Sequence, residues 1–226
     1  MIKTPENFYD VVIVGGGLAG LKSAIHLSKF GVNALVIEKN AYPKHKVCGE
    51  YISNEVLHYL NYLGLDPFIL GAKKIDKFLL STKKNSVIET QLPLGGFGIS
   101  RYALDDALAK KAIENGAIII QNSVENIKFL DNQFEIETKS LSVFNAKIVI
   151  GAYGKRSAID IKLDRDFIKN EAPFLAVKTH MKGVFPDDLA ALHNFKGGYC
   201  GLSKVEDGSI NVCYITDFKS FKKHKD

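Results

Sequence analysis

Residues 11–38 read VVIVGGGLAGLKSAIHLSKFGVNALVIE, and this stretch decides the fold of the chain. It begins with an apolar, β-branched run, which predicts a short strand buried on both faces of a parallel sheet. Apolar residues at helical spacing follow over 18–30, and Gly31 ends the predicted helix. A second buried strand is expected over 34–37, so the stretch forms one strand–helix–strand unit.

The turn between the first strand and the helix has the pattern Gly15-x-Gly17-x-x-Gly20. The first glycine permits the tight turn, the second leaves room for a pyrophosphate against bare backbone, and the third lets the helix approach the strand. Leu18 and Ala19 open the helix, whose unpaired N–H groups and positive end attract phosphate. Because the motif lies directly between a strand and a helix, it predicts dinucleotide binding; a glycine-rich turn without a ligand is the alternative.

Glu38 stands at the end of the second predicted strand. A carboxylate at this place accepts hydrogen bonds from ribose hydroxyls and repels a 2′-phosphate, which disfavours NADP. We include the adjacent Lys39 among the candidate cofactor-binding residues. The motif alone fits FAD or NAD, but about eighty residues separate Glu38 from the next buried strand at 118–120, which is long for a simple NAD domain and favours FAD.

The rest of the sequence predicts further helices and two groups of strands, one for each domain. Helices are expected after Ser53 and after Ser100, with a hairpin between them around the turn 83–85. More strands of the first domain are expected over 134–138 and 146–150, and strands of a second domain over 175–181, 190–195, 199–205 and 209–215.

The predicted fold class is therefore α/β: a doubly wound Rossmann-like FAD-binding domain with a second mixed or antiparallel β-sheet domain. We assign residues 1–70 and 100–160 to the discontinuous FAD-binding domain. Residues 71–99 and 161–226 form the predicted substrate domain, which we expect to be incomplete at its C-terminal end.

The composition narrows the class of protein. With 46% hydrophobic residues, no secretory signal pattern and no apolar run of membrane-spanning length, the 226-residue chain is expected to be cytoplasmic, without a transmembrane segment. Its three cysteines are too scattered for a disulfide framework or a zinc site, so free thiols and no metal are expected. The lysines at 219–225 lack interleaved aromatic residues, which favours a solvated terminus over a nucleic-acid site.

Three further segments resemble FAD-dependent oxidoreductases of the geranylgeranyl reductase and aromatic-hydroxylase-like superfamily: PKHKVCG at 43–49, SRYALDDAL at 100–108 and IGAYGKRS at 150–157. The resemblance implies that the Cys-Gly segment approaches the flavin and that Val124 contacts adenine through its backbone. The cofactor-binding residues that it adds are Lys46, Cys48, Gly49, Arg101, Val124 and Gly154.

Local chemistry leaves alternatives open at three of these residues. Arg101 at a helix start needs an anionic partner, for which the FAD pyrophosphate and Asp105 are the candidates. Cys48 is either a small residue that shapes the pocket or a reactive thiol. Lys46 serves the phosphates or belongs to a solvated loop.

The sequence departs from the family pattern in three ways. Tyr153 replaces the aspartate expected between Ala152 and Gly154, so the contacts of that aspartate are not carried over. The segment 198–203 keeps only the tyrosine of the prenyl-site motif, which weakens the case for an isoprenoid substrate. The family's second Gly-Asp segment would lie beyond residue 226, so we expect an N-terminal portion of a longer chain.

The predicted function is that of an FAD-dependent oxidoreductase, either a dehydrogenase or reductase or a monooxygenase, that acts on a small or lipid-like organic substrate. NAD(P)H is a candidate external reductant, and an electron-transfer protein is a candidate partner. An NAD-dependent dehydrogenase and a non-catalytic dinucleotide-binding protein are the alternatives. No catalytic residue is assigned; His45, His180 and His193 are candidates by residue type only.

Overall fold

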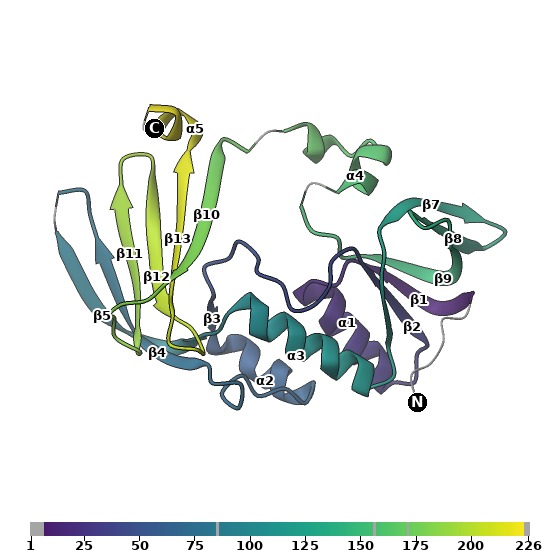
Figure 1. Ribbon diagram of the computed structural model, residues 1–226, viewed down its shortest axis with the longest axis horizontal. Coiled ribbons are helices and arrows are strands. Elements are labelled where there is room, and N and C mark those ends of the chain that lie inside the picture. Colours follow the sequence, from purple (N-terminus) through teal and green to yellow (C-terminus); the bar gives the residue numbers. More distant parts are fainter. Residues whose placement is uncertain (1–6, 85, 156, 171, 224–226) are drawn as a thin grey trace. The chain divides into compact units, whose positions relative to one another are not determined.

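The computed structural model describes residues 7–84, 86–155, 157–170 and 172–223 (Figure 1). The chain divides into two compact units, each built from two separate stretches of sequence. The first unit consists of Met1–Lys44 and Asp105–Glu171, and the second consists of His45–Leu104 and Ala172–Asp226. Each unit contains one β-sheet.

A six-stranded sheet forms the first unit, in the order β6-β2-β1-β9-β8-β7. The first four strands in that order pair in parallel, and β8 and β7 continue the sheet as an antiparallel meander. The strands are β1 (Phe8–Val14), β2 (Ala34–Glu38), β6 (Ile118–Gln121), β7 (Val124–Leu130), β8 (Gln133–Thr138) and β9 (Val143–Gly151). The helices of this unit are α1 (Leu18–Lys29), most of α3 (Arg101–Glu114), α4 (Ala158–Lys162) and the 3-10 helix η2 (Asp166–Lys169).

The core of this sheet is made by the apolar runs that the sequence contains. All five residues of β2 are buried, as are residues 11–14 of β1, because parallel strands are covered on both faces. The main apolar cluster comprises Tyr9, Val12, Val14, Leu35, Ile37, Ile118, Ile136, Phe144 and Ala146. The prediction of parallel strands at 11–14, 34–37, 118–120 and 146–150 is confirmed. Full burial is confirmed for 11–14 and 34–37, is only partial at 118–120, and is wrong for 146–150, where Lys147 and Ile148 are exposed.

The second unit is a seven-stranded mixed sheet in the order β10-β13-β12-β11-β4-β5-β3. Only the β4–β11 pair among its described strands is parallel. The strands are β3 (Tyr51–Ser53), β4 (Lys73–Ser81), β5 (Val87–Gly98), β10 (Phe174–Met181), β11 (Leu189–Phe195), β12 (Gly198–Lys204) and β13 (Ile210–Asp217). The short helices η1 (Asn54–Val56), α2 (Leu57–Tyr62) and α5 (Phe218–Lys223) also belong to this unit.

The structure confirms the predicted fold class, with a mixed second sheet, and adds elements that the sequence pattern did not indicate. Ser53 and Ser100 accept hydrogen bonds from backbone N–H groups in the first turns of their helices, as expected of N-caps. β3, β7, α4, η2 and α5 were not predicted. On α5, Lys219, Lys222 and Lys223 are exposed, which agrees with the expected solvation of these lysines. Three residues of the sequence argument, Asn85, Arg156 and Lys225, lie outside the described residues.

The boundary between the two units differs from the predicted domain boundary. Residues 45–70 were assigned to the FAD-binding domain, but they belong to the compact unit that contains the second sheet. The reason is a pairing between distant residues: β3 is hydrogen-bonded to the end of β5, with Tyr51 opposite Gly98. In the described part of the chain, no helix is both long enough and apolar enough to cross a membrane.

Ile136 tests the importance of the first unit's core. Its side chain is fully buried in the cluster, so Ile136→Ala should lower the free energy of unfolding by about 2–4 kcal/mol. Ile148→Ala, in the same sheet but with a side chain that is 54% exposed, is the matched control and should lower it by less than about 1 kcal/mol. Urea denaturation of the two variants measures the difference; equal losses would contradict this assignment of the core.

Candidate functional site

The glycine turn after β1 is held by contacts that only glycine allows. Gly15 has a φ of +105°, and a Cβ on it would lie 2.4 Å from the carbonyl oxygen of Ala152. A Cβ on Gly20 would lie 1.9 Å from the carbonyl oxygen of Gly15. The first and third glycines of the motif are therefore required by the turn itself and by the close approach of α1 to the end of β1.

The N-terminus of α1 has bare backbone at its cap. Gly17 is the N-cap residue and has an extended conformation, with φ −84° and ψ −171°, so no side chain caps the helix. The first N–H groups of a helix have no partner within the helix. Leu18, Ala19 and Gly20 thus present the dipole end and the N–H groups that suit a phosphate.

Glu38 lies at the end of β2 with a carboxylate that neighbouring N–H groups orient. The residue is 8% exposed. The N–H of Gly16 donates to Oε2 at 2.7 Å, while the backbone N–H and the Nδ2 of Asn40 donate to Oε1 at 3.0 and 2.8 Å. Glu38 therefore joins the glycine turn to the loop after β2 and keeps acceptor capacity for a ligand hydroxyl.

A cavity of about 250 Å³ in the first unit brings several predicted residues together. Its walls come from the ends of β1 and β2, the start of β7 and the segment that follows β9. The lining residues that matter here are Gly15, Glu38, Lys39, Val124, Tyr153 and Lys155. Gly154, with a φ of +73°, lies between two of them.

Tyr153, which replaces the family's aspartate, forms part of this cavity wall. Its ring lies over Gly151, where a Cβ would be 2.9 Å from the nearest ring carbon. Its hydroxyl donates to the buried carboxylate of Asp160 at 3.3 Å. Burial, and then the charge of Asp160, raise the pKa of Tyr153, so its hydroxyl stays protonated at neutral pH and above.

The other predicted cofactor residues, Lys46, Cys48, Gly49 and Arg101, belong to the second unit. The segment 46–49 lies on that unit's sheet, because Nδ2 of Asn211 donates to the carbonyl oxygens of Gly49, at 2.7 Å, and Cys48, at 3.3 Å. Arg101 begins α3. The part of these four residues in a cofactor site stays a prediction.

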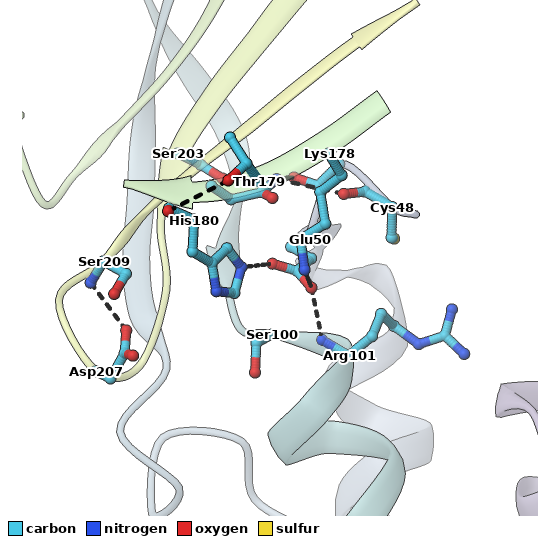
Figure 2. Close-up of polar contacts among 12 residues, drawn as sticks. Cys48, Glu50, Ser100, Arg101, Lys178, Thr179, His180, Ser203, Asp207 and Ser209 are labelled. Atoms are coloured by element: carbon cyan, nitrogen blue, oxygen red, sulfur yellow. Dashed lines mark hydrogen bonds and ion pairs between the residues drawn. The ribbon is translucent and has the colours of Figure 1, made fainter. Parts of the chain in front are cut away.

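Glu50, which the sequence reasoning missed, is the centre of a polar cluster in the second unit (Figure 2). Its side chain is fully buried. Nζ of Lys178 lies 2.6 Å from Oε1, Nε2 of His180 lies 2.6 Å from Oε2, and the N–H of Arg101 donates to Oε1 at 2.9 Å. Figure 2 shows the guanidinium group of Arg101 pointing away from the carboxylate.

The backbone of Glu50 is unusual as well. Its φ is +54°, in the left-handed region that non-glycine residues seldom adopt. Its carbonyl oxygen accepts the N–H of Ile99 at 3.1 Å. Glu50 thus combines a strained backbone with a fully buried carboxylate that three donors contact. Backbone strain of this kind is concentrated at functional sites, and a buried carboxylate is stable only when donors satisfy it.

Among the side chains of Glu50, Lys178 and His180, that of His180 is the most exposed, at 19% against 5% for Lys178. Its bond to Glu50 is satisfied whether the ring is neutral or protonated, because Nε2–H donates in both states. An imidazole oriented by a buried carboxylate is suited to proton transfer. The ring of His45 packs edge-on against His180, with centroids 5.3 Å apart.

The remaining candidates have local partners. Nδ1 of His193 lies 2.8 Å from Oγ of Ser81. Cys48, Cys200 and Cys213 are free thiols, as expected. Burial raises the pKa of Cys200 and Cys213, so these two thiols are not activated nucleophiles.

Three further residues of these sites were not singled out from the sequence: Asn40 and Tyr42 after β2, and Lys178 on β10. Only the place of Asn40 and Tyr42, within four residues of Glu38, was a usable signal. Nothing local indicated Lys178, because its partner Glu50 is 128 residues away in the sequence.

Comparison with known proteins identifies the family to which the chain belongs. A family model described as FAD binding domain matches residues 8–195, which is most of the chain. Digeranylgeranylglycerophospholipid reductase 1 of Methanosphaera stadtmanae is 32% identical over 94% of this chain and 54% of its own length. The FAD-dependent monooxygenase spyC of Aspergillus fumigatus is 27% identical over 81% of this chain and 39% of its own length.

The fold recurs in solved structures. A flavoprotein/dehydrogenase from Cytophaga hutchinsonii superposes with a TM-score of 0.82 at 20% identity, over 97% of this chain and 58% of that one. The chain thus spans about half the length, or less, of the relatives that it matches.

The Glu50 cluster predicts a large effect on stability. Glu50→Gln leaves buried Lys178 without its counter-charge, so the free energy of unfolding should fall by about 3–5 kcal/mol at neutral pH. The control, Glu135→Gln, removes one partner of a half-exposed pair with Lys128 and should change it by less than about 1 kcal/mol. Urea denaturation distinguishes the two; a Glu50→Gln loss no larger than that of the control would refute the central place given to Glu50.

Proposed function

Because the chain belongs to the FAD-binding-domain family, we propose that its first unit binds FAD and that the chain is part of a flavin-dependent oxidoreductase. The observation that carries this proposal is the Glu38 carboxylate, held beside the bare glycine turn in one cavity. A turn without side chains suits a pyrophosphate, and an oriented carboxylate suits ribose hydroxyls.

The residues of the first unit fit the adenosine and pyrophosphate parts of this cofactor. Gly17, Leu18 and Ala19 would hold the pyrophosphate with backbone N–H groups, and Glu38 would accept from the ribose. Val124, at the start of β7, supports the proposed adenine contact because it lines the same cavity. Lys39 and Lys155, on the cavity wall, would add positive charge near the phosphates.

When bound, FAD supplies redox chemistry, which the protein directs through binding, orientation and electrostatics. The second unit is the proposed place of the organic substrate. There His180, held by Glu50, is the group best arranged to give or take a proton. Lys46, Cys48, Gly49 and Arg101 remain proposed cofactor residues from that unit.

The reaction class stays open between a reductase or dehydrogenase and a monooxygenase, since relatives named for both are similar to this chain. A small or lipid-like substrate, NAD(P)H as reductant, an electron-transfer partner and a cytoplasmic location belong to the proposal. An NAD-dependent dehydrogenase would share the glycine turn, and a non-catalytic dinucleotide-binding protein would share the cavity. Release of FAD, identified by mass, would exclude the NAD-dependent dehydrogenase. Reduction of the bound flavin by NAD(P)H would argue against the non-catalytic protein.

Gly17→Val tests the cofactor assignment. The φ of Gly17 suits any residue, so the fold should persist, but a side chain would stand against the pyrophosphate and weaken FAD binding at least about tenfold. The measurement is the visible spectrum and nucleotide content of the purified protein, with Gly183→Val, in the other unit, as the control. Unchanged FAD content in Gly17→Val, or a wild-type protein that takes up NAD instead of FAD, would defeat the proposal.

A further inference from the structure

The glycine turn contains one glycine more than the nucleotide-binding motif explains. The motif needs Gly15, Gly17 and Gly20, whereas Gly16 occupies a position open to other residues. The structure supplies a local reason. A Cβ on Gly16 would lie 1.8 Å from the hydroxyl oxygen of Tyr42 and 2.9 Å from Cβ of Glu38. A side chain at residue 16 would therefore require Tyr42 above all, and also Glu38, to move.

Tyr42 is bonded to the same residue that it covers. Its hydroxyl donates to the carbonyl oxygen of Gly16 at 2.5 Å. The N–H of Gly16 donates to Glu38, so both polar backbone groups of this glycine are held by residues at or just after the end of β2. A run of three glycines is otherwise the most flexible backbone that a chain can have.

The protonation state of Tyr42 suits this contact. Burial raises the pKa of Tyr42 above its ordinary value, and the negative charges of Glu38 and Asp105 raise it further. The hydroxyl therefore stays protonated through the neutral and mildly alkaline range. It remains a hydrogen-bond donor to Gly16 throughout that range.

We propose that Tyr42 is a positioning residue for the cofactor: it fixes the glycine turn in the conformation that receives the pyrophosphate and keeps Glu38 oriented through Gly16. This inference rests on the proposed binding of FAD by the first unit. Its physical basis is preorganisation, because a turn already fixed in the free protein loses less conformational freedom when the ligand binds. Tyr42 lies four residues after Glu38, outside the glycine motif.

Removal of the hydroxyl alone tests the contact. In Tyr42→Phe, the apoprotein should bind FAD about fivefold more weakly, which is the effect expected of one hydrogen bond, and should release it faster. The control is Tyr62→Phe, which removes a hydroxyl from a side chain that is 45% exposed on α2, in the second unit; its affinity for FAD should stay within about twofold. Titration of apoprotein with FAD, followed by flavin fluorescence, gives both dissociation constants.

A second substitution separates positioning from general destabilisation. Gly16→Ala should weaken FAD binding more than about tenfold in the wild-type background, because its Cβ meets the Tyr42 hydroxyl. In a Tyr42→Ala background the same change should cost a clearly smaller factor, since the ring is gone. Equal factors in the two backgrounds would overturn the proposal, as would Tyr42→Phe that lowers the melting temperature of the apoprotein but leaves FAD affinity unchanged.

The outcomes also distinguish this inference from the proposed function. If the wild-type protein binds no FAD, both the proposed function and the role of Tyr42 are refuted. If the wild-type protein binds FAD and the Tyr42→Phe variant binds and releases it equally well, only the role of Tyr42 is refuted. Weaker binding in Tyr42→Phe with an unchanged melting temperature of the apoprotein supports the positioning role.

Discussion

The close approach of α1 to the end of β1 is the contact on which the first unit depends. A Cβ on Gly20 would stand 1.9 Å from the carbonyl oxygen of Gly15, so the helix can lie there only with glycine at this point. That approach places the N-terminus of α1 at the carboxyl end of a central strand, where parallel neighbours bring Glu38 alongside. This steric condition accounts for the bare backbone at the turn, while the start of β7 and the segment after β9 supply the rest of the cavity wall.

The second unit depends in the same way on one buried group, the carboxylate of Glu50. Glu50 brings together the segment after Cys48, the start of α3 and strand β10, which are far apart in the sequence. Without donors, a carboxylate in this place would be strongly unfavourable, so Lys178, His180 and the N–H of Arg101 are conditions for its burial. The same contacts orient His180 and leave it partly exposed. The contacts that stabilise the unit therefore also hold the side chain proposed for proton transfer.

Elements with a strong local pattern were predictable, and elements with weak patterns were not. The parallel strands, α1 and the four C-terminal strands have clear apolar runs or alternation. β7 is mixed in polarity, and β3 has only three residues, so neither gives a periodic signal. The grouping of residues 45–70 with the second sheet has the same origin, because the pairing of β3 with β5 joins segments more than forty residues apart.

By itself, the sequence determined the strand–turn–helix–strand unit, its glycine motif and the acidic residue at the end of β2. These features are encoded within about thirty residues, where periodicity and glycine placement act locally. Only the tertiary structure decided that Tyr42 holds Gly16, and that Glu50 binds Lys178 and His180. Those contacts join residues 26 to 130 positions apart, and they depend on loop paths and on the position of each strand within its sheet, which local sequence patterns do not specify.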